Sequence, residues 1–73
     1  MGTVDLGRNI KRFRVEAKLP IKTVAKEIGV TIQALYRYER GDREPSVAIV
    51  SAIARVLGRR VYEFYEEEDD GEE

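Results

Sequence analysis

The chain has 73 residues, 42% of them hydrophobic and 37% charged, which allows one small domain. It has no cysteine and no histidine, and this excludes disulfides, thiolate metal sites and nucleophile chemistry that relies on histidine. No apolar run is long enough to span a bilayer and no signal peptide is recognisable, so we expect a soluble cytoplasmic domain without a cofactor or a metal.

The formal net charge of −1 hides an uneven distribution along the chain. Residues 66–73 hold 7 of the 14 acidic residues, whereas residues 1–65 carry all 13 Lys and Arg and a net charge of +6. A basic body favours a polyanionic partner such as nucleic acid, although basic bodies with solvated tails are also common. We expect one domain over residues 1–65 and a disordered acidic tail over residues 66–73, which either solubilises the chain or competes with nucleic acid.

The first predicted helix begins after Asp5, a good N-cap residue, and runs to about Ala17. Its apolar residues recur at helical spacing and fall within about 60° of arc: Leu6, Ile10, Phe13 and Ala17. A second helix starts at Pro20, where the missing N–H costs little, and ends at Gly29, which permits a positive φ. Its inner face consists of Val24, Ala25 and Ile28.

Three further helices follow in the sequence. Thr31 is a good N-cap for a third helix, which ends near Arg40 and Gly41. A fourth helix opens at Pro45 and Ser46, runs to about Leu57 and is closed by Gly58, and a short fifth segment covers residues 61–65. Because no strand pattern is convincing, the sequence predicts an all-α domain of five short helices.

The second and third helices form a helix-turn-helix pattern, although their spacing also fits an ordinary helical hairpin. At 100° per residue, Leu35 and Tyr38 of the third helix face the core. The exposed face presents an amide, two guanidinium groups, a phenol and an aliphatic side chain: Ile32, Gln33, Tyr36, Arg37 and Arg40. The major groove of DNA suits this set, since Gln pairs with adenine, Arg with guanine and an apolar group with the thymine methyl. The alternative is an ordinary solvated surface.

From Leu6 to about Tyr65 the sequence resembles the Cro/repressor-type (XRE-like) helix-turn-helix domain. The resemblance is carried by an ordered series of short motifs: Ile10-x-x-Phe13-Arg14, Leu19, Val24-Ala25-x-x-Ile28-Gly29-Val30-Thr31, Leu35-x-x-Tyr38-Glu39-Arg40-Gly41, Pro45-Ser46 and Ile53-Ala54-x-x-Leu57-Gly58. It implies a five-helix DNA-binding domain that acts as a two-fold dimer on a palindromic operator, with the third helix in the major groove.

The resemblance also implies roles for particular residues. Base contacts fall on residues of the exposed face of the third helix: Ile32, Gln33, Tyr36 and Arg37. Phosphate contacts fall on Thr31, Arg40 and Arg43, and we add Lys22 and Lys26 because they flank the expected groove. The basic residues of the first helix, Arg8, Lys11 and Arg12, are expected to form an ordinary solvated face.

An ion pair between Arg14 and Glu39 is implied as well, joining the first helix to the third. If the pair is buried, removing one partner costs about 3–5 kcal/mol. If it is exposed, the pair contributes only about 0–1 kcal/mol.

Three places depart from the usual pattern of this family. Pro20 and Ile21 stand where Ser-Gln is common, so a glutamine that anchors a phosphate is missing, although backbone N–H groups remain at that helix start. Lys18 stands where glycine often closes the first helix. Arg59 and Arg60 replace an apolar residue and a hydroxyl cap before the fifth helix.

The fourth helix has more apolar surface than one core needs. Its inward face comprises Val50, Ile53, Ala54 and Leu57, and a second stripe comprises Ile49, Ala52 and Val56. This second stripe, together with Tyr62 and Tyr65, predicts a homodimer interface, whereas Phe64 is expected to complete the core of the monomer.

These observations predict a sequence-specific regulator of transcription that binds double-stranded DNA as a homodimer, is repressor-like and is associated with the nucleoid. The alternative is a protein-interaction module of the same fold, an antitoxin or adapter, which uses the apolar stripe or the acidic tail and binds DNA weakly and without sequence preference. Catalysis is not expected, because half of the carboxylates cluster in the tail, where nothing holds them in a catalytic geometry.

Overall fold

A computed structural model describes residues 4–67 and consists of five helices in this range. They are α1 (Leu6–Glu16), α2 (Ile21–Ile28), α3 (Ile32–Arg40), α4 (Val47–Leu57) and α5 (Val61–Phe64). The predicted all-α architecture of five short helices is confirmed. None of these helices is long and apolar enough to cross a membrane.

Polar side chains start three of the helices, as the sequence predicts. The N-cap residues Asp5, Thr31 and Ser46 each accept a hydrogen bond from the backbone N–H three residues ahead, at 3.1, 3.0 and 3.2 Å. Each cap satisfies one of the N–H groups that have no partner at a helix start, and its loss costs about 1 kcal/mol.

Left-handed residues end the first four helices. Three of them are the predicted glycines, Gly29, Gly41 and Gly58, and the fourth is Lys18, at φ 61°. After α1 the chain therefore turns at Lys18, and the amide N–H groups of Lys18 and Leu19 bond back to the carbonyls of Val15 and Arg14. This turn corrects one expectation: Ala17, placed on the apolar stripe by its spacing, is exposed, because α1 has already ended at Glu16.

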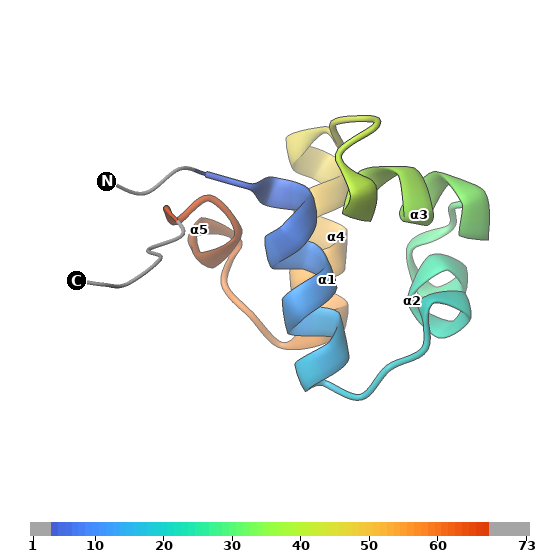
Figure 1. The fold of residues 1–73 in the computed structure, drawn as a ribbon. Coiled ribbons are helices and arrows are strands. Elements are labelled where there is room, and N and C mark those ends of the chain that lie inside the picture. Colours follow the sequence, from blue (N-terminus) through green and yellow to red (C-terminus); the bar gives the residue numbers. More distant parts are fainter. Residues whose placement is uncertain (1–3, 68–73) are drawn as a thin grey trace.

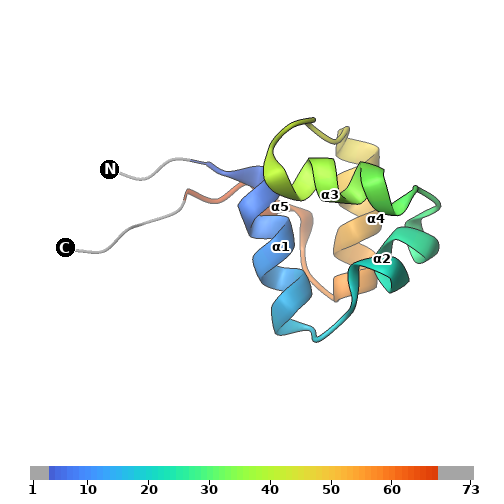
Figure 2. The same ribbon diagram turned by 45° about the vertical axis from the view of Figure 1, so that its right-hand side comes forward.

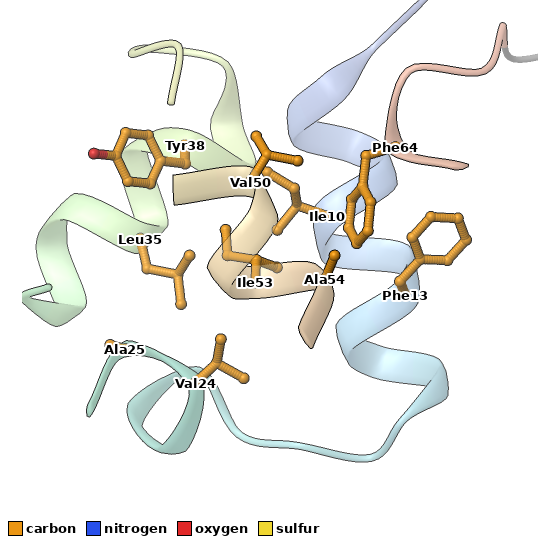
Figure 3. Close-up of a cluster of buried hydrophobic side chains, with 10 residues drawn as sticks. All are labelled: Ile10, Phe13, Val24, Ala25, Leu35, Tyr38, Val50, Ile53, Ala54 and Phe64. Carbon is orange, nitrogen blue, oxygen red and sulfur yellow. The ribbon is translucent and has the colours of Figure 1, made fainter. Parts of the chain in front are cut away.

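The core is built by side chains from all five helices (Figure 3). Ile10, Leu35, Val50, Ile53 and Phe64 are fully buried, and Phe13 meets Phe64 edge-on with ring centroids 4.9 Å apart. The predicted inward faces of the second, third and fourth helices are therefore largely confirmed, and so is the burial of Phe64. At roughly 25 cal/mol per Å² of buried apolar surface, this cluster is the main source of stability.

The other helices are arranged around α1. In the view of Figure 1, α4 passes behind α1, with α5 on one side of α1 and with α2 and α3 on the other. α1 contacts α3, α4 and α5, while α2 packs against both α3 and α4. α3 is thus supported along one side only, which leaves its opposite face outward.

A buried asparagine connects the first helix to the end of the fold. The side-chain amide of Asn9, which is 1% exposed, donates hydrogen bonds to the carbonyl oxygens of Phe64 at 2.8 Å and Glu66 at 3.3 Å. Because a buried amide without partners is costly, these bonds fix where the chain leaves α5. The predicted acidic tail begins at this point, and its residues 68–73 lie outside the described residues.

Candidate nucleic-acid interface

α2, the turn at Gly29 and α3 form a helix-turn-helix. Gly29 adopts φ 77°, and the N–H of Val30 bonds back to the carbonyl of Ala25, which closes α2. Thr31 then caps α3, so only three residues separate the two helices. Ala25 is 1% exposed, and its small side chain allows α2 and α3 to cross closely. α3 is therefore held in a fixed orientation on the rest of the domain.

The outward face of α3 carries all four side chains predicted to contact bases: Ile32, Gln33, Tyr36 and Arg37. Two of them are large apolar or aromatic groups left in solvent, since Ile32 is 38% and Tyr36 is 48% exposed. On the opposite face, Leu35 and Tyr38 are buried. The structure thus gathers a carboxamide, a guanidinium group, a phenol and an aliphatic group on one accessible surface.

The five residues predicted to contact phosphate are also exposed: Lys22, Lys26, Thr31, Arg40 and Arg43. The lysines belong to α2, Thr31 and Arg40 bound α3, and Arg43 follows it. Arg40 pairs with Asp42 at 3.2 Å, and both side chains are largely exposed, so this pair contributes little and leaves Arg40 available. Thr31 already accepts the N–H of Ala34, which leaves its hydroxyl hydrogen for another acceptor.

The structure accounts for Pro20 and Ile21 at the start of α2, where Ser-Gln is common. Ile21 is half-buried and packs against the core, so this position contributes apolar contact instead of a polar side chain. Pro20 precedes the helix in an extended conformation, and its own side chain makes no cap. The first N–H groups of α2 therefore depend on solvent or on a ligand.

The implied ion pair between Arg14 and Glu39 is present and buried. The Nε of Arg14 donates to one carboxylate oxygen of Glu39 at 2.6 Å, and its Nη2 donates to the other at 3.2 Å. A third donor, Nη1, reaches the carbonyl of Leu19 at 2.9 Å. The two side chains are 13% and 3% exposed, so the buried alternative holds. This pair ties α1 to α3.

Gly7 brings α1 and α3 into contact, and sequence reasoning missed it. A Cβ added at Gly7 would overlap the carbonyl oxygens of Tyr38 and Glu39 in the last turn of α3. The available signal was a glycine inside a helical pattern, which often marks a close approach of backbones. Gly7 therefore sets how the first turn of α1 crosses the end of α3.

An open hollow lies beside this crossing. Its volume is about 620 Å³, and four of its lining residues are basic: Arg8, Lys11 and Arg14 from α1 and Arg40 from α3. Tyr36 also lines it, and Asp5 and Glu39 supply its two carboxylates. Apart from the Arg14–Glu39 pair, the lining contains the cations of Lys11 and Arg40 and the carboxylate of Asp5.

The helix-turn-helix family model HTH_3 matches residues 10–64, which include all five helices apart from the first turn of α1. The chain belongs to this family. An uncharacterized HTH-type transcriptional regulator from Methanocaldococcus jannaschii is 30% identical over 61 residues, covering 84% of this chain and 92% of its own length. A putative HTH-type transcriptional regulatory protein from Pyrobaculum aerophilum is 33% identical over 55 residues, and the match spans 75% of this chain but only 22% of that protein.

Solved helix-turn-helix structures share the fold. The DNA-binding domain of the P22 C2 repressor superposes with a TM-score of 0.81 at 25% identity, over 88% of this chain and 84% of that one. The biofilm regulator SinR, crystallised in complex with DNA, gives 0.79 at 25% identity, over 85% of this chain and all of that one. The family and the fold are those of DNA-binding regulators of transcription, as the resemblance implies.

Proposed function

We propose that this protein regulates transcription by inserting α3 into the major groove of double-stranded DNA. The observation that carries the proposal is the outward face of α3, where Gln33 and Arg37 stand exposed beside Ile32 and Tyr36. Gln and Arg make bidentate hydrogen bonds to adenine and guanine, and apolar groups contact the thymine methyl. The buried pair of Arg14 and Glu39 keeps this face in a fixed orientation.

The phosphate backbone binds around this face. Lys22 and Lys26 approach it from α2, and Thr31, Arg40 and Arg43 approach it from the two ends of α3. Affinity falls as salt rises, and each phosphate neutralised by such a cation makes the slope of log affinity against log salt more negative by about 0.9. These contacts position the domain, whereas the outward face of α3 selects the sequence.

The regulator acts as a homodimer on a palindromic site. Tyr62 is 62% and Tyr65 is 37% exposed, while Ile49, Ala52 and Val56 of α4 are half-buried. Ile49 and Val56 already pack against the core, so the exposed tyrosines supply most of the apolar area for a partner. A two-fold dimer places two copies of α3 one helical turn apart, about 34 Å along the duplex.

Alanine variants test base reading. Gln33→Ala and Arg37→Ala should each cost about 1–3 kcal/mol of binding energy at particular base pairs of the preferred site and nothing at the others. Lys26→Ala is the matched control, since it removes a charge on α2 and should weaken all duplexes equally. Equal weakening of all duplexes by Arg37→Ala would refute its role in base reading.

Mass measurements over the micromolar range test the dimer. Tyr62→Glu should shift the chain to monomer without unfolding it, because Tyr62 lies outside the buried core. Val15→Glu is the control, because Val15 is an exposed apolar residue of α1, 55% exposed, that does not belong to the proposed interface. A wild-type chain that stays monomeric at high micromolar concentration would exclude the homodimer.

Exposed apolar side chains also favour a second candidate function, a protein-interaction module of the same fold. Val47 is 66% exposed in the first turn of α4, and Tyr62 is comparably exposed in α5. Such side chains often mark a partner surface. This candidate predicts tight complex formation with another protein and weak DNA binding without sequence preference, which the binding experiments above distinguish from the first.

The acidic residues after Tyr65 limit DNA affinity in this proposal. A full-length variant with Gln or Asn at the five acidic positions of residues 68–73 should bind any duplex more tightly than the wild type at low salt, because these five negative charges repel DNA in the wild type. Equal affinities at low salt would leave this segment only a solubilising role.

A further inference from the structure

The hollow between α1 and α3 gives the basic residues of the first helix a position beside the recognition helix. Lys11 lies one helical turn after Gly7, so both residues are on the side of α1 that faces α3. Lys11 and Arg8 line the hollow together with Tyr36 and Arg40. The expectation that these α1 residues form an ordinary solvated face omits this shared hollow.

The charge of the hollow comes from a small number of residues. Glu39 is neutralised by Arg14 in the buried pair, and Asp5 accepts the backbone N–H of Arg8 as the cap of α1. Lys11 and Arg40 then outnumber the single remaining carboxylate of the lining, that of Asp5. Two cations beside one open, solvent-accessible hollow are suited to an anion such as phosphate.

The position of the hollow fits one particular anion. The major groove is about 12 Å wide and an α-helix with its side chains is about 10–12 Å across, so sugar-phosphate strands pass close along both sides of a helix in the groove. α1 crosses the C-terminal end of α3 (Figure 2), where Gly7 meets the carbonyls of Tyr38 and Glu39. A strand that passes this end of α3 also passes the hollow.

We propose that the hollow between α1 and α3 is a phosphate site for the DNA backbone, in which Lys11 binds a phosphate adjacent to the one bound by Arg40. The site rests on the proposed function, because it requires α3 in the major groove. It makes α1 a third DNA-contacting helix beside α2 and α3. The contact is independent of sequence, since it reaches only the backbone.

The test compares full-length variants on a preferred duplex and on a scrambled one between about 50 and 200 mM salt. Lys11→Gln should make the slope of log affinity against log salt less negative by about 0.9. The loss of affinity relative to the wild type is then about 3.5 times larger at 50 mM than at 200 mM salt. Both duplexes should be affected equally. Lys11→Arg should keep the wild-type slope. Arg55→Gln is the control: it removes the same charge from an exposed position in the last turn of α4, outside the hollow, and should leave the slope unchanged.

The outcomes separate the two proposals. If the wild type reads sequence but Lys11→Gln behaves like Arg55→Gln, the phosphate site is refuted and the proposed function stands. If Lys11→Gln weakens only the preferred duplex, Lys11 reads a base and the backbone site is also refuted. If the effect of Lys11→Gln disappears when the acidic positions of residues 68–73 are neutralised, the occupant of the hollow is that segment and not DNA. A wild type without salt-dependent DNA binding overturns the proposed function itself.

Discussion

Arg14 of α1 clamps the carboxylate of Glu39 in α3 through two hydrogen bonds, 25 residues apart in the chain. Both side chains are largely withdrawn from solvent, and the third donor of Arg14 holds the carbonyl of Leu19 after α1. One guanidinium group therefore fixes α3 and the connection to α2 at once. A buried bidentate pair of this kind orients its helices more than it stabilises the fold.

Removing one partner of this pair should be far more damaging than removing both. Arg14→Met leaves the Glu39 carboxylate buried without its cation and should lower the free energy of unfolding by about 3–5 kcal/mol, as measured by urea denaturation. The double variant R14M/E39M should cost much less than the sum of the two single variants. Single-variant losses below about 1 kcal/mol would show that the pair behaves as a solvent-exposed one.

Gly7→Ala distinguishes helix propensity from the close approach of α1 to α3. In an open helix this change stabilises by about 1 kcal/mol. Here the added methyl group meets the backbone carbonyls of Tyr38 and Glu39, which cannot rotate away, so unfolding should become easier by about 1–3 kcal/mol. The sign of the change in urea midpoint decides between the two, and a stabilised variant contradicts the contact.

Lys18→Gly should stabilise the fold by about 0.5–1 kcal/mol, because Lys18 occupies the left-handed region, where a Cβ is unfavourable. The matched control is Gly29→Ala at φ 77°, where an added Cβ has nothing within 4 Å, so that only the backbone conformation is tested. Thermal midpoints of the two variants should move in opposite directions. A lower midpoint for Lys18→Gly would show that its side chain contributes more than its strained backbone costs.

The pH dependence of α5 follows from Glu63. The backbone N–H of Arg60 and the guanidinium group of Arg59 donate to its carboxylate, at 3.0 Å each, and lower the pKa of Glu63. Since the pKa is lower in the folded chain, the stabilisation is present above the ordinary glutamate pKa of about 4.3 and is lost as the pH falls below it. The stability difference between wild type and Glu63→Gln should therefore shrink between pH 6 and about pH 3; a constant difference contradicts this assignment.

The sequence predicts the helices well because their boundaries are local. Asp5, Thr31 and Ser46 cap helices within three residues, and Gly29, Gly41 and Gly58 end them. The outward face of α3 could likewise be predicted, since helical periodicity assigns Leu35 and Tyr38 to the core and the intervening polar residues to solvent.

Contacts between distant segments could not be predicted in this way. The burial of Asn9 depends on carbonyl oxygens more than fifty residues away, and the role of Gly7 depends on the backbone of α3. Arg59 illustrates the same limit: it lies over the ring of Phe13, 4.2 Å from its centroid, and pairs with Glu16 at 2.7 Å. Nothing in the spacing of these residues indicates their partners.

The central claim is that α3 reads DNA sequence, and selection of bound duplexes from a randomised library at about 150 mM salt tests it most directly. The account predicts recovery of a palindrome whose half-sites are centred about 10–10.5 base pairs apart, with Arg37→Ala relaxing particular positions in each half. A pool without a preferred sequence, bound with an affinity that vanishes as salt rises, would contradict base reading and reduce the outward face of α3 to a general basic surface.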